Sequence, residues 1–316
     1  MRENISKWAG SPKIQHYIYK VNTAVREWLM GLFRLVVTLG VVYIILIPIL
    51  GIISNSIKDY EDLYNPLVYL IPEHFTNIHY KFAVEYMDYF VSLFNSVSLT
   101  LASTALQVVV CSMVGYGFAR FRFPGSSILF GLVIATIVVP VQTFTVPMFM
   151  QFRYFSFFGL KFNFISTYWP AIILTATGMG LRSGLYIYIF RQFFKGLPKE
   201  VEEAALIDGA GPFRTYAAVM MPNAVSAIIT VAMFSFVWQY NDTFYSALLM
   251  SGKKFLPVSL GGLAGLYTFA GERLNNNQVR LIVYAGIIIT IIPVLVFYLG
   301  LQRYFMEGIE RSGIVG

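Results

Sequence analysis

Six apolar segments, each long enough to cross a lipid bilayer as a helix, constrain the fold of this chain more than any other feature. They cover approximately residues 35–53, 95–118, 126–150, 168–191, 223–240 and 281–301. A helix needs about 20 apolar residues to cross the hydrocarbon core, and lipid offers no partner for the open edges of a sheet. The chain is also 57% hydrophobic and only 12% charged, too apolar for a soluble domain of 316 residues. The sequence therefore predicts an all-α membrane protein with six transmembrane helices.

The distribution of lysine and arginine predicts the orientation of these helices. If the N-terminus is cytoplasmic, the inner segments carry more of these residues than the outer ones, and positive residues favour the cytoplasm. We therefore expect both termini on the inner side. This topology gives a cytoplasmic segment 1–34, a transmembrane domain 35–301 and a cytoplasmic tail 302–316, with an extracytoplasmic loop at 54–94 and a cytoplasmic loop at 192–222. No cleavable signal peptide is expected, because the first apolar run is too long for a signal core.

Composition excludes several classes of function. The single cysteine, Cys111, rules out a disulfide framework, and the three histidines are scattered, which disfavours a histidine metal site. The net charge of +7 follows the membrane topology rather than a nucleic-acid-binding patch. The sequence contains no phosphate-binding GxxxxGK(S/T) motif and no evident nucleophile–base pair. We therefore expect a chain that is not an enzyme and that itself binds no cofactor, metal or nucleic acid.

A polar, glycine-containing insert at 203–222 separates the fourth and fifth apolar segments. Pro198 suits the first position of a helix, and the glutamates that follow suit its positive end. Gly209 can adopt the left-handed conformation that ends such a helix. A second short helix is predicted from about Pro212 to Met221. The insert is therefore predicted to be a helix-turn-helix.

One face of this helix-turn-helix carries small residues that would let a partner approach closely. Val201, Ala205 and Asp208 lie near this face by the three-to-four-residue spacing of a helix. We interpret the insert as a docking site for a partner outside the bilayer. The alternative is an amphipathic loop that rests on the inner leaflet.

Polar and helix-breaking residues within the third and fourth segments are candidates for a translocation path. Pro140 and Pro147, with Gln142 and Thr143 between them, predict a kinked helix that faces protein or water; an ordinary hydrogen-bonded seam between helices is the alternative. Arg182 is expected near mid-depth, where a charge is costly and faces the bundle interior or a cavity. It is predicted to bind substrate or a companion subunit. Alternatively, nearby glycines break the helix and let Arg182 snorkel.

The outer end of the fifth segment brings together aromatic and amide side chains. Trp238 and Tyr240 offer rings that could stack on the apolar faces of sugars, and Asn241 offers an amide for their hydroxyls. Tryptophan and tyrosine are also enriched at membrane interfaces as anchors. Both interpretations remain open for this segment.

The insert matches a known family pattern over its full spacing. The matching positions are Glu203, Ala204, Ala205, Gly209, Val219, Met221 and Pro222. This pattern resembles the EAA loop of permease subunits of bacterial ATP-binding-cassette importers, although the family more often has isoleucine and leucine where this chain has Val219 and Met221. Further motifs resemble the carbohydrate-importer branch, most closely the second permease of maltose-type systems. They are Asn95-Ser96, the run from Gly115 to Gly125, Val139-Pro140 with Pro147, the run from Arg191 to Phe194, and Asn241-Asp242 followed by Leu256-Pro257.

The resemblance covers about residues 90–316 and implies a type I importer permease in the bacterial cell membrane. It implies that an ATPase docks on the insert and drives alternating access. The docking residues would be Glu203, Ala204, Ala205, Asp208, Gly209 and Pro222. The implied partners are a homologous second permease, two ATP-binding-cassette ATPases that bind ATP and magnesium, and an extracytoplasmic solute-binding protein. The C-terminal tail would reach between the ATPases; a frayed cytoplasmic end is the alternative.

The resemblance favours a carbohydrate as the transported solute, and an oligosaccharide in particular. The candidate path residues are Gln142, Thr143, Arg182, Trp238, Tyr240 and Asn241. Two alternatives stay open. One is an ion-coupled secondary transporter, which would need ionisable relays within its helices; the other is an importer for a non-sugar solute such as a glycerol-phosphate diester.

Overall fold

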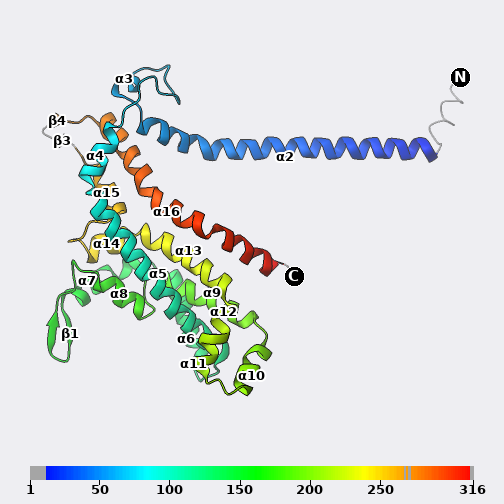
Figure 1. Cartoon of the computed structure of the whole chain (residues 1–316), viewed down its shortest axis with the longest axis vertical. Helices are drawn as coiled ribbons and strands as arrows, with labels where there is room; N and C mark the ends of the chain where they lie inside the picture. Colours follow the sequence, from blue (N-terminus) through cyan, green and yellow to red (C-terminus); the bar gives the residue numbers. More distant parts are fainter. Residues whose placement is uncertain (1–11, 267, 270–271, 314–316) are drawn as a thin grey trace. The chain divides into compact units, whose positions relative to one another are not determined.

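The computed structural model describes residues 12–266, 268–269 and 272–313. Contacts between residues divide the chain into two units, Met1–Phe75 and Thr76–Gly316, and each is considered by itself. Most of the described residues are helical (Figure 1). The predicted all-α fold class is therefore confirmed.

The first unit is dominated by one long helix, α2 (Pro12–Ser56). The first apolar segment lies within this helix, but the helix begins well before residue 35. The expected boundary between a segment 1–34 and a membrane helix therefore does not coincide with a break in the backbone; residues 1–11 of that segment lie outside the described residues. After α2, the short helix α3 (Tyr60–Leu63) leads into a loop, which closes through a bridge between Lys58 and Phe75.

The second unit contains the remaining helices and two small hairpins. Its longer helices are α4 (Ile78–Tyr86), α5 (Tyr89–Arg120), α6 (Ser126–Val138), α7 (Thr145–Arg153), α8 (Trp169–Ala176), α9 (Ser183–Gly196), α10 (Lys199–Ile207), α13 (Val225–Tyr240), α15 (Leu256–Leu263) and α16 (Asn276–Gly313). Its short helices are η1 (Val141–Phe144), α11 (Pro212–Thr215), η2 (Tyr216–Met220), α12 (Met221–Asn223) and α14 (Phe244–Leu249). Its antiparallel hairpins pair β1 (Phe155–Phe157) with β2 (Leu160–Phe162), and β3 (Thr268–Phe269) with β4 (Glu272–Arg273).

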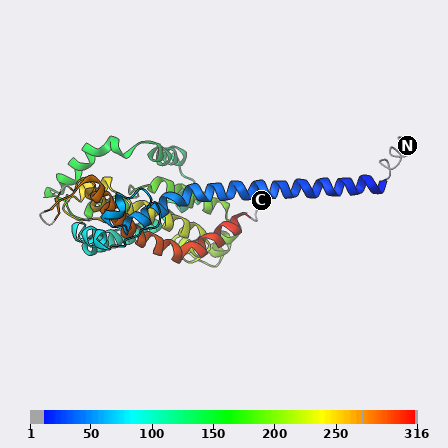
Figure 2. The same ribbon diagram turned by 90° about the horizontal axis from the view of Figure 1, so that it is seen from above.

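Helix α5 is the centre of the second unit, because it packs against both α9 and α13. In turn, α16 (orange to red) runs beside α13 in both views (Figures 1 and 2). The approach of α5 to α9 is close at Gly115, where an added Cβ would lie 2.7 Å from Cβ of Phe190. A second close approach joins α9 to α6, since a Cβ at Gly184 would lie 2.3 Å from Oγ1 of Thr136. Small residues therefore set the helix spacing around α5, as is common where membrane helices pack together.

Among the described residues, three helical stretches are long and apolar enough to cross a membrane, judged by length and composition: Tyr19–Ser56, Tyr89–Arg120 and Asn276–Tyr304. Two bent pairs would raise the number to five if each pair formed one span. These pairs are Ser126–Val138 with Val141–Arg153, bent by 98°, and Pro212–Asn223 with Val225–Tyr240, bent by 80°. The third segment is thus broken at Pro140 far more sharply than a kinked helix, and the count of six spans stays a prediction.

The fourth apolar segment is not one continuous helix, and the expectation of an unbroken span over 168–191 is wrong. It forms α8 and α9, separated by residues 177–182. The break contains Gly178 in the left-handed conformation, at φ +74°, a geometry that glycine adopts without steric cost. In this segment the glycines therefore interrupt the helix, although the apolar run is long enough for one continuous span.

We predict that Gly115→Ala destabilises the fold and that Gly117→Ala, on the same helix, does not. A methyl group at position 115 would crowd Phe190 and the backbone nitrogen of Arg191, whereas nothing lies within 4 Å of a methyl group at position 117. Overpacking of this kind costs about 1–3 kcal/mol. The measurement is the thermal unfolding midpoint, followed by thiol-dye labelling of Cys111, which is buried on α5 and is the only cysteine of the chain. Equal midpoints for the two variants would contradict the α5–α9 packing described above.

Candidate functional site

A cavity of about 960 Å³ lies where two helix breaks meet in the second unit. Its wall comes from the α6–η1–α7 elbow, from the break between α8 and α9, and from the segment that follows Val237 at the end of α13. Most of the lining is apolar. Its polar and charged side chains include Gln142, Gln151, Arg182, Asn241 and Asp242. An apolar pocket with a few convergent polar groups is the usual form of a small-molecule site.

Arg182 lies at the break itself rather than within a helix. It has φ +61° and immediately precedes α9. Its guanidinium carbon lies over the ring of Trp238, 4.3 Å from the ring centre, which is within the range of a cation–π interaction. The expected placement within a continuous helix is therefore wrong, and the alternative of a glycine-broken segment describes the structure.

The structure brings together four of the six predicted path residues. Gln142, Arg182, Trp238 and Asn241 all line the cavity. Thr143 is exposed but is not part of the lining.

Tyr240 points away from the cavity and does not line it, so the structure does not group it with the other four residues. It is 2% exposed, and its hydroxyl donates to the backbone oxygen of Thr290 at 2.7 Å. Residues two apart on a helix are separated by about 200° around its axis. Trp238 and Tyr240 therefore face opposite sides of α13, which places Tyr240 against α16.

A buried glutamine, Gln107, holds the α8–α9 break in place. Its amide nitrogen donates to the backbone oxygen of Leu181 at 2.7 Å and to the hydroxyl of Ser183 at 3.2 Å. Its amide oxygen accepts from the hydroxyl of Ser235 on α13. The sequence prediction missed Gln107, although a glutamine inside an apolar segment is a signal, because such a side chain requires partners within the bundle.

The predicted helix-turn-helix is present in the second unit. Helix α10 follows Pro198, which flanks the helix rather than occupying its first turn. Asp208 flanks the other end, and Gly209 has φ +81° as expected for the residue that ends the helix. The chain then continues through α11, the single π-helical turn η2 and α12, which contains Pro222.

The exposed face of α10 differs from the face predicted for docking. Ala205 is buried and Val201 is half-buried, so these two residues anchor α10 to its own chain. The exposed residues towards the end of α10 and at its C-cap are Glu203, Ala204, Leu206, Ile207 and Asp208. Ile207 is 85% exposed at the turn. The spacing of small residues identified the face that packs inward, because close approach serves internal packing as well as docking.

Glu202 connects α10 to the end of α5. Its carboxylate accepts a hydrogen bond from the hydroxyl of Tyr116 at 2.6 Å and pairs with Nε of Arg120 at 3.1 Å. Arg120 also donates to the backbone oxygen of Leu197 at 2.9 Å. Glu202 was not among the predicted site residues, because its partners are distant in the sequence.

Comparison with known protein families gives one match that covers about two thirds of the chain. The family model described as "Binding-protein-dependent transport system inner membrane component" matches residues 107–311. A trehalose transport system permease protein from Mycobacterium tuberculosis is 30% identical over 86% of this chain and 93% of its own length. An arabinooligosaccharides transport system permease protein from Halalkalibacterium halodurans is 28% identical over 87% of this chain and 93% of its own.

Among solved structures, one similar chain belongs to a bacterial ABC transporter involved in the import of the acidic polysaccharide alginate. The two chains are 19% identical, with a TM-score of 0.67, and the likeness covers 90% of this chain and 97% of the other. At this identity the likeness concerns the fold alone.

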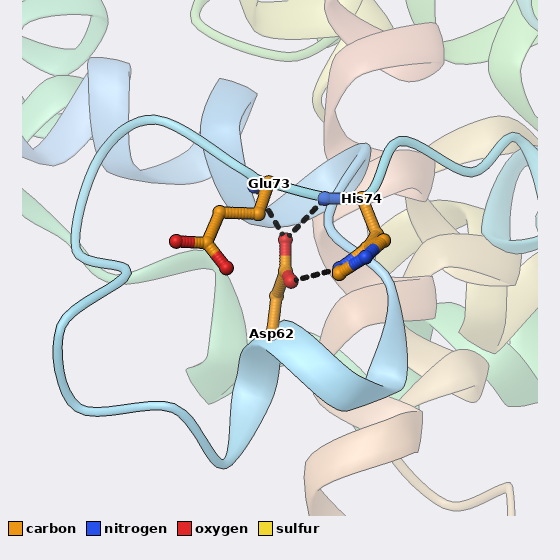
Figure 3. A group of neighbouring side chains, drawn as sticks. All are labelled: Asp62, Glu73 and His74. Atoms are coloured by element: carbon orange, nitrogen blue, oxygen red, sulfur yellow. Dashed lines mark hydrogen bonds and ion pairs between the residues drawn. The ribbon is translucent and has the colours of Figure 1, made fainter.

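A separate polar cluster lies in the first unit, where Asp62 of α3 meets Glu73 and His74 of the loop that follows this helix (Figure 3). The possible ligand atoms of Asp62, Glu73 and His74 lie within 4.8 Å of one another, as a metal site would require. The buried carboxylate of Asp62, however, already accepts from the backbone N–H groups of Glu73 and His74, both at 2.8 Å, and pairs with the imidazole of His74 at 2.8 Å. We therefore interpret the cluster as a clasp that closes the loop.

We predict that this clasp is tightest at intermediate pH. The hydrogen bond to Asp62 raises the pKa of His74, so the stabilisation is complete below the ordinary value of about 6.5 and is lost as the pH rises through the raised value. Burial alone would raise the pKa of Asp62, but the hydrogen bonds from His74 and Glu73 lower it overall. That stabilisation is present above about 3.9 and is lost as the pH falls through the lowered value.

The measurement is amide hydrogen exchange at Glu73 and His74, corrected for the intrinsic rate at each pH. His74→Gln should remove the increase in exchange on the alkaline side and keep the increase on the acidic side. An alkaline increase of the same size in this variant would contradict the role of the Asp62–His74 pair.

Proposed function

The chain belongs to the family of binding-protein-dependent transport system inner membrane components, and on this premise we propose that it is the permease subunit of an ATP-driven importer for a carbohydrate. The observation that carries the proposal is the arrangement along α5. Near its middle, Gln107 holds the break that borders the cavity, and near its end, Tyr116 and Arg120 hold the exposed helix α10 through Glu202. One helix would thus join the proposed solute site to the proposed docking site.

The family and the apolar helices together identify a multi-pass protein of the bacterial inner membrane. We propose the topology expected from the charge distribution, with both termini and residues 192–222 in the cytoplasm. In this orientation α10 projects towards cytoplasmic subunits.

We propose that a cytoplasmic ATPase docks on the exposed face of α10 and on the turn after it. The apolar side chains of Leu206 and Ile207, 48% and 85% exposed, would enter an apolar groove, and Glu203 and Asp208 would lie at its polar rim. Such an amphipathic helix seated in a groove is a common mode of recognition. Two ATPases, which would bind ATP and magnesium, a homologous second permease and an external binding protein would complete the transporter.

Movement of the ATPases would reach the cavity through α5. A displacement of α10 acts on Tyr116 and Arg120 through the Glu202 carboxylate, and α5 carries it to Gln107 and so to the α8–α9 break. At the breaks the continuous helical hydrogen-bond pattern is interrupted, and turn hydrogen bonds such as that from the Ser183 N–H to the Gly180 oxygen take its place. A change in the angle between the broken helices would therefore disturb these turns rather than the helices themselves. This supports alternating access in which α5 moves as a rod and the cavity wall changes shape.

A carbohydrate is the solute class best supported by the relatives and by the cavity. The similar permeases are named for trehalose and arabinooligosaccharides. The amide groups of Gln142, Gln151 and Asn241 line the cavity, and amides both donate to and accept from sugar hydroxyls. An ion-coupled secondary transporter is not favoured by any of these observations.

We predict that Ile207→Glu prevents the ATPases from binding and abolishes ATP-dependent uptake. The substitution would bury an unpaired carboxylate in the proposed interface, which is strongly unfavourable. The measurements are co-purification of the ATPase subunits and uptake of labelled trehalose and arabinotriose into proteoliposomes that contain the complete transporter. Leu67→Glu, the same change at a residue 90% exposed in the first unit, should retain the ATPases. Uptake without any ATPase would contradict the proposed function.

We predict that Tyr116→Phe weakens coupling without releasing the ATPases. The variant loses the hydroxyl that donates to Glu202, while its ring can still contact Phe194. A hydrogen bond to a charged group contributes about 1.5–3 kcal/mol, so the number of solute molecules moved per ATP should fall several-fold. Tyr188→Phe removes a hydroxyl from an exposed tyrosine of α9 and should leave this ratio unchanged. A normal ratio in Tyr116→Phe would refute transmission through Glu202.

A further inference from the structure

Arg182 carries a charge that no acidic side chain in the described part of the chain neutralises. The ion pairs of the described residues include His74 with Asp62, Arg120 with Glu202 and Lys254 with Asp88, and none of them involves Arg182. The guanidinium nitrogens of Arg182 also donate no hydrogen bond to another described residue, and the group lies over the ring of Trp238. The cavity therefore has a cation whose N–H groups are available.

The carboxylate that lines the same cavity, Asp242, is already used by its own chain. It is 8% exposed, and it accepts from the backbone N–H groups of Tyr245 and Ser246, at 3.2 and 2.9 Å, and from the Ser246 hydroxyl at 3.1 Å. These bonds fix the start of α14. Asp242 is therefore committed to the fold, and no other aspartate or glutamate lines the cavity within the described residues.

The contact with Trp238 changes what this side of the cavity can recognise. The guanidinium lies over the ring, so it occupies one of the two ring faces on which a sugar could stack. An arginine held against an aromatic ring keeps its N–H donors, which match the geometry of a carboxylate. The combination favours an anionic group over the apolar face of a neutral sugar.

The backbone at Arg182 is held in position from the other side of the chain. The amide of Gln107 binds the oxygen of Leu181, the preceding residue. Gly180 leaves room for that amide, because an added Cβ there would lie 3.0 Å from the Gln107 nitrogen. Arg182 is thus positioned before any ligand arrives, which lowers the cost of binding.

We propose that Arg182 binds a negatively charged group of the transported solute, so that the carbohydrate is an acidic one such as a uronate oligosaccharide. The proposal rests on the proposed function, since it assumes that the cavity belongs to the solute path. The carboxylate of the solute accepts from the Arg182 guanidinium, and the amides of Gln142 and Asn241 face its hydroxyls. A carboxylate of the second permease would satisfy Arg182 by the same chemistry, and the experiment distinguishes these two sources.

The experiment measures ATP-dependent uptake of matched trisaccharides into proteoliposomes that contain the complete transporter. The probes are trigalacturonate, trimannuronate, the methyl ester of each, and maltotriose, so that each acid differs from its ester only in charge. The wild type should favour an acid over its ester. Arg182→Gln should reduce uptake of the acid at least about tenfold, since a hydrogen bond to a charged group is worth that factor, and should change uptake of the ester little.

Arg153→Gln is the matched control, because Arg153 is exposed at the end of α7 and does not line the cavity; it should keep the preference for the acid. Arg182→Lys should retain part of the preference for the acid.

Preference of the wild type for the esters or for maltotriose, or a preference for the acid that persists in Arg182→Gln, would overturn the inference. Neither result would contradict the proposed carbohydrate importer. Loss of the second permease on purification of Arg182→Gln would assign Arg182 to the subunit interface and also overturn the inference. Absence of ATP-dependent uptake for every probe would count against the proposed function itself.

Discussion

The structure depends on how polar groups are satisfied inside a bundle that lipid surrounds. Water can solvate a glutamine or a glutamate on a soluble protein, but the hydrocarbon core offers no such partner. The buried face of α5 carries Gln107, Ser112 and Tyr116, and each of these residues binds a group on another element: the α8–α9 break, η2 and α10. Apolar packing brings these elements together, and the hydrogen bonds of α5 fix their register.

The same constraint explains why the helix breaks lie where they do. A break exposes backbone carbonyl and N–H groups, which is tolerated at membrane depth only where protein or a cavity receives them. The backbone oxygen of Leu181 accepts a hydrogen bond from the amide of Gln107. The α6–α7 elbow at Pro140 lines the cavity together with the α8–α9 break. The helix breaks at proline and glycine therefore border the cavity, and the buried Gln107 supplies the hydrogen bond that the exposed backbone oxygen of Leu181 needs.

The sequence predicted those features that depend on local preference. The apolar run that became α5 and the left-handed Gly209 were both evident, because length and backbone freedom determine them. The break at Arg182 required weighing glycines against apolar length, and the inward face of α10 could not be distinguished from a docking face by spacing alone. Glu202 and Gln107 escaped notice because their partners lie 86 and 74 residues away along the chain. Contacts at such separations follow from tertiary packing, which a local pattern does not encode.

The short distance between Gln107 and Tyr116 determines how α5 could transmit a displacement from one residue to the other. These residues are nine positions apart on a helix without an internal proline, which corresponds to about 14 Å at the rise of an α-helix. Over so short a length a helix transmits displacement rather than bending, because bending would break its own hydrogen bonds. A motion imposed on Glu202 must then either move the backbone at Leu181, and Arg182 with it, or break a buried hydrogen bond at a cost of about 1–3 kcal/mol. We propose that the first outcome prevails, so that the stiffness of one helix would link the chemistry at the cavity to the position of α10.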